Sequence, residues 1–392
     1  MQFSDTFEFN CPVKVLCGKR ALEHIPYELE ALNARKPLLL CDEDAARENR
    51  GRAVADALRE SNMVLGVVDP LPAGVDLDLV HQVAAIYRDK DCDALLAMGT
   101  GSLVDTVKLV NLVVSTGQDD PNVFAGVGRI QERLKPMALI APAAATGYEA
   151  AGRAQAGKTR WRSLTLMPDL LIIDQRTIGA PGAEALVESG LTALAFGAEA
   201  VLDPEKLPMA DIYAANAVQM AVASLIRAPQ TPDAVDVRMA AANAAAMAGC
   251  TLADKAPGRL HRLGRQLSAS GRVSPGKALG ILLPGTVGYG ALNWCWAVAD
   301  LLRPLVGLDR FACTPAAQRP LAVITALTHL VNGLFDDTEG RIPRTLQDVG
   351  FNPEDLAPLA EAASGAPNGP DRHAALTILT NALDGRPIHP DY

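Results

Sequence analysis

The pattern of hydrophobic and polar positions changes character once along the chain. Before Pro181, short apolar runs alternate with stretches of helical spacing. The runs predict strands at 36–41, 63–69, 93–99, 136–143 and 169–175, and the spacing predicts helices from 44 to 60, 76 to 89 and 102 to 115. Apolar runs separated by helical patterns are typical of a parallel sheet that helices cover on both faces.

After Pro181 the strand signals fade. Long Ala- and Leu-rich stretches predict helices at 184–202, 212–227, 234–252 and 317–335, and the segment 364–373 reads as an exposed loop. We therefore predict an α/β domain over residues 1–182 and an all-helical domain over residues 183–392.

Composition narrows the class of protein. The 392 residues carry a net charge of −9, which argues against nucleic acid or an acidic membrane as partner. The N-terminus lacks the order of a signal peptide, and we read no apolar run as long enough to span a bilayer. Seven dispersed cysteines without a CxxC pair are typical of buried thiols in a reducing compartment, so we expect a cytoplasmic protein.

One glycine-rich stretch points to phosphate chemistry. The sequence MGTGSLVDTVK (98–108) follows a predicted strand and begins a predicted helix. Gly99 and Gly101 allow a ligand to approach the backbone, Ser102 offers a hydroxyl, and the helix start offers free N–H groups to an anion. The alternative is that the glycines serve only the geometry of the turn.

Acidic residues add a second indication. Asp42 follows a predicted strand in the first α/β repeat, where a carboxylate can accept hydrogen bonds from an adenosine ribose and repel a 2′-phosphate. This favours NAD over NADP. The alternative is a solvated acidic turn, because Glu43 and Asp44 adjoin it. Asp105 and Lys108, three residues apart, are open to the alternative of a surface ion pair.

The order of these motifs resembles the iron-containing (group III) alcohol dehydrogenase family over nearly the whole chain. The family's GGGSxxDxAK loop matches 99–108, its PTTxGTGSE matches PAAATGYE at 142–149, and its GxDAxxHxxEA matches 190–200. The second match is one residue short, which is more like the maleylacetate reductase branch. On the matched positions, the resemblance implies a cofactor-binding role for Asp105 and Thr146.

The resemblance also implies a fold and a chemistry. It implies an N-terminal α/β domain with a parallel Rossmann-like sheet and an all-α C-terminal domain, the dehydroquinate synthase-like fold, with a cleft between the domains. NAD(H) would lie on the α/β side and transfer hydride to or from a carbonyl carbon that a divalent metal polarises. A homodimer or larger homo-oligomer is implied in the same way.

The implied metal site is degenerate in this sequence. The family's Asp and the His four residues later fall on Thr192 and Phe196, and the last His falls on Pro275. Only His261 is kept, with Arg265 at the second histidine of its HxxxH segment. One imidazole and a neutral hydroxyl do not hold Fe²⁺ or Zn²⁺ tightly, so we expect no tightly bound divalent metal.

Basic residues near these positions are candidates for the missing charge. His261 is a candidate proton donor or polar contact, or a helix histidine that a neighbour satisfies. Arg265 and Lys277 are candidates to polarise a carbonyl or to bind an anionic substrate in place of the metal. The alternative is that both are solvent-facing basic residues.

The second motif also departs from the family. Ala143 and Ala144 replace two threonines, which predicts weaker nucleotide binding. Tyr148 replaces a serine and either fills part of the site or acts as an acid. Glu199 matches a family glutamate that is not a ligand, so we expect a structural role.

Two functions follow as hypotheses. The first is an NAD(H)-dependent oxidoreductase acting on an alcohol, aldehyde or ketone without a catalytic metal. The alternative is a catalytically impaired relative with a binding or assembly role. Different chemistry on the same scaffold, as in sugar-phosphate cyclases and polyol dehydrogenases, also relies on a metal, so the same losses argue against it.

Overall fold

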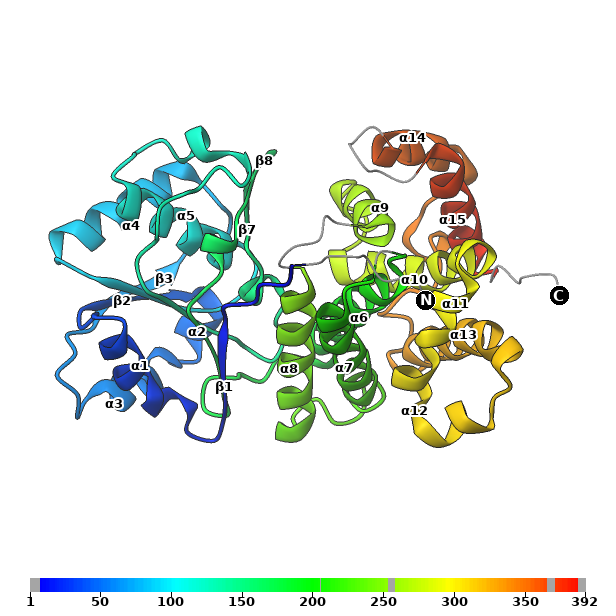
Figure 1. Cartoon of the computed structure of the whole chain (residues 1–392), viewed down its shortest axis with the longest axis horizontal. Coiled ribbons are helices and arrows are strands. Elements are labelled where there is room, and N and C mark those ends of the chain that lie inside the picture. The colour runs from blue at the N-terminus through cyan, green and yellow to red at the C-terminus, as the bar shows by residue number, and fades with distance from the viewer. Residues whose placement is uncertain (1–7, 205, 253–257, 365–370, 387–392) are drawn as a thin grey trace. The chain divides into compact units, whose positions relative to one another are not determined.

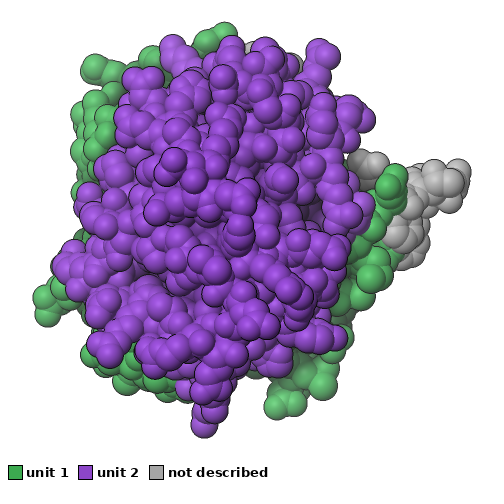
Figure 2. Space-filling model, turned by 90° about the vertical axis from the view of Figure 1, so that its left-hand side faces the viewer, with its two compact units in different colours: residues 1–9, 181–392 green, residues 10–180 purple. Residues whose placement is uncertain are grey.

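The chain folds as two compact units. The computed structural model describes residues 8–204, 206–252, 258–364 and 371–386. One unit spans Asn10–Ala180 and is called the α/β unit; the other spans Pro181–Tyr392 with Met1–Phe9 and is called the helical unit (Figures 1 and 2). Most of the loop predicted at 364–373 lies outside the described residues.

The α/β unit is built on a parallel sheet of six strands in the order β1-β9-β6-β4-β2-β3. The strands are β1 (Lys14–Gly18), β2 (Pro37–Asp42), β3 (Gly66–Leu71), β4 (Ala94–Met98), β6 (Met137–Ile140) and β9 (Leu170–Asp174). The helices of this unit are α1 (Ile25–Ala31), α2 (Glu43–Arg47), α3 (Gly51–Leu58), α4 (Leu77–Asp89) and α5 (Ser102–Thr116), with short 3₁₀ turns η1 (Ala21–His24), η2 (Pro121–Phe124), η3 (Tyr148–Ala150) and η4 (Leu164–Leu166).

The apolar runs form this sheet because both of its faces are buried. Leu39 and Cys41 of β2 join a core cluster with residues of η1, α1 and α3. Leu38 and Leu40 point to the opposite face and are equally buried. The predicted parallel sheet with helices on both faces, and the helix-only second half, are confirmed.

Some elements differ from the prediction. The helix expected at 44–60 is two helices, α2 and α3, because the chain turns at Asn49, whose φ is 52°. The edge strand β1 lacked a clear signal because most of its residues are exposed. A small sheet, β5 (Gly126–Val127), β8 (Thr159–Arg162) and β7 (Arg153–Ala156), also escaped prediction, since β7 and β8 are rich in polar and basic residues.

An ion cluster joins the end of β9 to η1. The Arg176 guanidinium donates to both carboxylate oxygens of Glu23, at 2.8 and 2.7 Å, and to those of Asp174, at 2.9 and 2.8 Å. The hydrogen bonds from Arg176 hold the pKa of Glu23 at about 2, against an ordinary 4.5. The cluster therefore stabilises the fold only while the carboxylates are ionised.

We expect Arg176→Met to lower the free energy of unfolding by about 1–2 kcal/mol at pH 7, after allowance for solvent screening at this partly exposed side chain. Because the pKa of Glu23 is lower in the folded chain, its contribution is complete above pH 4.5 and is lost as the pH falls toward 2. Urea unfolding should show the gap between wild type and variant closing over that range, whereas Arg59→Met, at an exposed ion pair with Asp56, should matter little at any pH. A gap that stays constant with pH would contradict this account.

The helical unit contains α6 to α15. They are α6 (Ala183–Leu202), α7 (Pro208–Leu225), α8 (Val235–Thr251), α9 (Arg259–Ala269), α10 (Pro275–Asn293), α11 (Cys295–Asp300), α12 (Leu302–Cys313), α13 (Arg319–Asp337), α14 (Pro353–Ser364) and α15 (Arg372–Asp384), with 3₁₀ turns η5 (Ala316–Gln318) and η6 (Gln347–Val349). Helix α6 packs closely on α7, because a side chain at Gly197 would meet the backbone of Ala214 at 2.9 Å. Small residues in α6 thus set the helix spacing.

The length of α6 differs from what we expected of the apolar runs in the sequence. Its 20 residues are long and apolar enough to cross a membrane by length and composition, contrary to the expectation that no run has that length. Within the helical unit, however, 78% of its most apolar window is buried, as in the core helix of a globular protein.

The exposure of the cysteines also differs from the sequence-based expectation. All seven lie among the described residues and none is in a disulfide, but only Cys41 and Cys250 are buried, while Cys17, Cys295 and Cys313 are exposed. The expectation of buried thiols is therefore wrong for those three.

Candidate functional site

The glycine-rich stretch forms a turn between β4 and α5. Gly99 has a φ of 147° and Gly101, the residue before α5, a φ of 59°, conformations that side-chain-bearing residues rarely adopt. No described side chain caps α5. The amides of Leu103 and Val104 donate to the carbonyls of Thr100 at 3.3 Å and Gly101 at 3.1 Å, so the turn offers an anion the amides that precede them. The Ser102 hydroxyl oxygen accepts a 2.9 Å hydrogen bond from the Gly74 amide, which leaves its own proton to donate.

Asp42 lies beside this turn, because β2 and β4 are neighbouring parallel strands. Its carboxylate is half-buried and accepts from the Ala45 amide at 2.7 Å, capping α2, and from the Thr100 amide at 3.3 Å. Burial raises its pKa. Glu43 and Asp44 are exposed, whereas Asp42 itself is half-buried and hydrogen-bonded.

Asp105 and Lys108 form an internal network. The Lys108 side chain is fully buried and its ammonium donates to the carbonyls of Tyr148, Ala151 and Arg153, at 2.7, 2.5 and 3.1 Å. The Asp105 carboxylate accepts from the Gln155 amide at 3.1 Å. Burial raises the pKa of Asp105 to about 6 and lowers that of Lys108 to about 8. The surface ion pair is therefore wrong, and the pair ties α5 to the chain from η3 to β7.

The loop 142–149 is organised around Glu149, which the sequence did not single out. Its carboxylate is 1% exposed and accepts from the Thr146 amide at 3.1 Å and the Thr146 hydroxyl at 3.2 Å. It also accepts from the Thr100 hydroxyl at 2.8 Å. Tyr148 begins η3 and is half-buried, with its carbonyl held by Lys108. Thr146, Tyr148 and the glycine turn thus share one network.

In the helical unit, Thr192 and Phe196 lie one turn apart in α6. The Thr192 hydroxyl donates to the Glu188 carbonyl at 2.9 Å, so it points back along its own helix. The Phe196 ring is 3% exposed and lies 5.3 Å from the His261 ring of α9, measured between centroids. The two rings are tilted by 45° relative to each other, so the phenyl ring packs against the imidazole in a tilted arrangement.

Glu199 holds the start of α9. Its carboxylate accepts from the amides of Leu260 at 2.7 Å and His261 at 3.4 Å, and Gly258 leaves room for it. It therefore acts as a helix cap, the structural role expected. Arg265 is half-buried on the same helix, one turn beyond His261.

The start of α10 carries the remaining positions. Pro275 is its first residue and is exposed. The Lys277 ammonium donates to Glu184 of α6 and lies 3.8 Å from a Glu188 carboxylate oxygen. Lys277 is therefore partly buried rather than fully solvent-facing, and carboxylates of α6 balance its charge.

These side chains do not fit a tightly bound Fe²⁺ or Zn²⁺. At the four positions that the resemblance assigns to ligands, the chain offers a hydroxyl, a phenyl ring, an imidazole and a proline. Across the described ranges, no group of three or more His, Cys, Asp or Glu side chains converges as a metal site would require.

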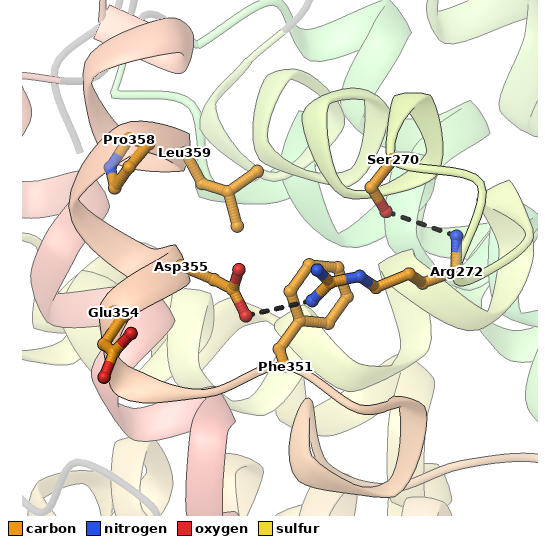
Figure 3. A pocket seen from close by; sticks show the side chains of 7 residues that line it. All are labelled: Ser270, Arg272, Phe351, Glu354, Asp355, Pro358 and Leu359. Atoms are coloured by element: carbon orange, nitrogen blue, oxygen red, sulfur yellow. Dashed lines mark hydrogen bonds and ion pairs between the residues drawn. The ribbon is translucent and has the colours of Figure 1, made fainter.

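A separate surface pocket of about 480 Å³ lies in the helical unit (Figure 3). Its Arg272 guanidinium donates to Asp355 at 2.9 Å and lies over the Phe351 ring at 4.7 Å. None of the predicted site residues lines it, and of its charged lining residues Arg272 and Asp355 pair with each other.

Comparison with known proteins places these features in a family. The model described as iron-containing alcohol dehydrogenase matches residues 12–175, and the one for the C-terminal part of that family matches residues 186–378. The chain belongs to the iron-containing alcohol dehydrogenase family. The resemblance seen in the motifs is thereby confirmed.

The relatives include alcohol and aldehyde oxidoreductases. The chain is 24% identical to an NAD-dependent methanol dehydrogenase of Bacillus methanolicus over 91% of this chain and 92% of that protein. It is 27% identical to maleylacetate reductase 2 of Cupriavidus pinatubonensis over 90% and 94%. A solved structure of 1,3-propanediol oxidoreductase matches with a TM-score of 0.84 at 20% identity, covering 96% of this chain and all of that one.

Proposed function

We propose that the protein is an NAD(H)-dependent oxidoreductase that acts on an alcohol, aldehyde or ketone without a tightly bound catalytic metal. The NAD(H) dependence is supported mainly by the glycine turn at the start of α5. Two glycines in positive-φ conformations and an uncapped helix start suit a pyrophosphate. The adjacent Asp42 suits an unphosphorylated ribose, which favours NAD over NADP.

The residues of the α/β unit fit such a cofactor. The amides of the turn and the Ser102 hydroxyl would hold the phosphates, while Asp42 would accept from the ribose with the lone pairs that its two intrachain bonds leave. Thr146 and Asp105 are proposed to shape this site through the network around Glu149 and Lys108. When bound, the nicotinamide supplies the hydride chemistry.

The absence of a tightly bound metal from this proposal is supported by side chains of α6. The Thr192 hydroxyl is hydrogen-bonded to the Glu188 carbonyl of its own helix, and Phe196 packs on His261. Both observations favour chemistry that does not depend on Fe²⁺ or Zn²⁺. We propose His261, Arg265 and Tyr148 as candidate catalytic groups: His261 and Tyr148 to move a proton, and Arg265 to polarise a carbonyl or bind an anionic substrate. Lys277 is a weaker candidate, since Glu184 and Glu188 balance its charge.

The test combines three measurements on one purified sample. We expect calorimetric titration to show NADH binding, elemental analysis to find far less than one iron or zinc per chain, and turnover of an aldehyde panel to survive a chelator. Stoichiometric metal, or turnover that the chelator removes, would contradict the metal-free mechanism. Absence of NADH binding at high micromolar concentration would contradict the cofactor assignment.

The second candidate is a catalytically impaired relative with a binding or assembly role. It is favoured by the balanced charge of Lys277 and by Ala143 and Ala144, which lack the hydroxyls of the family motif. It predicts no NADH consumption with any metal added, so robust turnover would exclude it. For either candidate function we also propose a cytoplasmic location and a homodimer or larger assembly. We propose no nucleic-acid or membrane partner.

A further inference from the structure

The glycine turn and the 142–149 loop are joined by one side chain whose role the proposed function leaves unassigned. Thr100 lies between the two glycines of the turn, at a position where the resembling family has glycine. Its hydroxyl donates a 2.8 Å hydrogen bond to the Glu149 carboxylate. Its amide donates to Asp42 at 3.3 Å. Thr100 thus connects a residue at the end of β2 with the second loop.

The acceptor of this bond is poorly placed to find another donor. Glu149 is 1% exposed, and it also accepts from the amide and the hydroxyl of Thr146. When a buried carboxylate loses a hydrogen bond, its desolvation penalty is no longer offset by that bond, so the folded state is destabilised. The Thr100 hydroxyl therefore restrains Glu149, and through Glu149 the loop that carries Thr146.

We propose that Thr100 is a positioning residue that fixes the glycine turn to the 142–149 loop before the dinucleotide binds. The inference rests on the proposed function, because it assigns the nucleotide to this turn. A turn held in its binding conformation loses less conformational freedom when the ligand arrives, so affinity rises without a new ligand contact. Thr100 acts through Glu149 and Asp42 rather than on the reacting atoms.

The chain offers a matched control. Thr106 of α5 is buried, whereas Thr100 is half-buried, and the Thr106 hydroxyl has no hydrogen-bond partner among the described residues. Thr100→Val and Thr106→Val therefore make the same chemical change close together in the fold, and only the first removes a hydrogen bond. Thr100→Ser keeps the hydroxyl and serves as the rescue variant.

The experiment measures NADH affinity by calorimetry and amide hydrogen exchange of the free protein. We expect T100V to weaken NADH binding about tenfold and to speed exchange in both 99–104 and 146–149. T106V and T100S should stay near wild type in both measurements. In turnover assays T100V should raise KM for NADH with little change in kcat.

Three results would overturn the proposal, and two of them concern how the variants compare. One is wild-type affinity and exchange in T100V; the other is a T100S as weak as T100V, since the hydroxyl would then not be the cause. If the wild type itself binds no NADH, the cofactor assignment fails, and the exchange measurement still decides whether Thr100 joins the two segments. Faster exchange in only one segment would also overturn it.

Discussion

Replacing Lys108 with methionine should lower the free energy of unfolding of the α/β unit by about 3–5 kcal/mol. The change leaves the carbonyls of Tyr148, Ala151 and Arg153 without their donor and removes the only ammonium that faces the Asp105 carboxylate among the described residues. Methionine has a similar length, so the loss is one of hydrogen bonds and charge rather than of volume. Calorimetric unfolding should show a melting temperature lower by roughly 6–20 °C.

Lys277→Met is the control for this experiment. The Lys277 ammonium pairs with Glu184 and Glu188, but all three side chains keep contact with solvent. Its replacement should cost less than about 1 kcal/mol. A K108M protein as stable as K277M would show that the buried network does not hold the α/β unit together.

The second large effect is expected at Gly99. A Cβ atom there would lie 2.1 Å from a carboxylate oxygen of Asp42 and 2.7 Å from the Leu103 side chain, at a backbone φ of 147°. Gly99→Ala therefore forces Asp42 away from the Thr100 amide and from its cap of α2. We expect NADH affinity to fall by about 100-fold or more, since overpacking and backbone strain each cost about 1–3 kcal/mol.

Gly117→Ala tests whether the effect is specific to the turn. Gly117 ends α5, has a φ of 70°, and leaves open space where a Cβ atom would lie. G117A should lose about 1 kcal/mol of stability and keep wild-type NADH affinity. A G99A protein that binds NADH as wild type does would contradict the placement of the nucleotide at this turn.

The sequence was most informative where a pattern depends on local physics. Apolar runs such as 36–41 became buried strands because a strand covered on both faces must be apolar on both faces. The polar hairpin of β7 and β8 gave no such signal, because Trp161 is its one large, fully buried side chain. The motif matches identified the family without any knowledge of tertiary contacts, because each motif is a short, continuous run of residues.

The partners of charged side chains were beyond the sequence. The spacing of Lys108 and Asp105 is equally compatible with a surface pair, and only the packing of β7 on α5 buried Lys108 and half-buried Asp105. From the sequence, Lys277 was a candidate to replace the charge of the metal. Only the packing of α10 against α6 places Glu184 and Glu188 beside it. Thr100 and Glu149 lie 49 residues apart, so no spacing rule joins them.

The helix GLTALAFGAEAVL, residues 190–202, shows both limits. The sequence by itself determined that it is a buried helix, because residue types and helical spacing are local properties. The family resemblance implies a carboxylate and an imidazole where this chain has Thr192 and Phe196. Only the tertiary structure decided what fills that face. The Phe196 ring packs on His261, and Glu199 caps α9, because contacts between helices depend on how the chain folds back on itself.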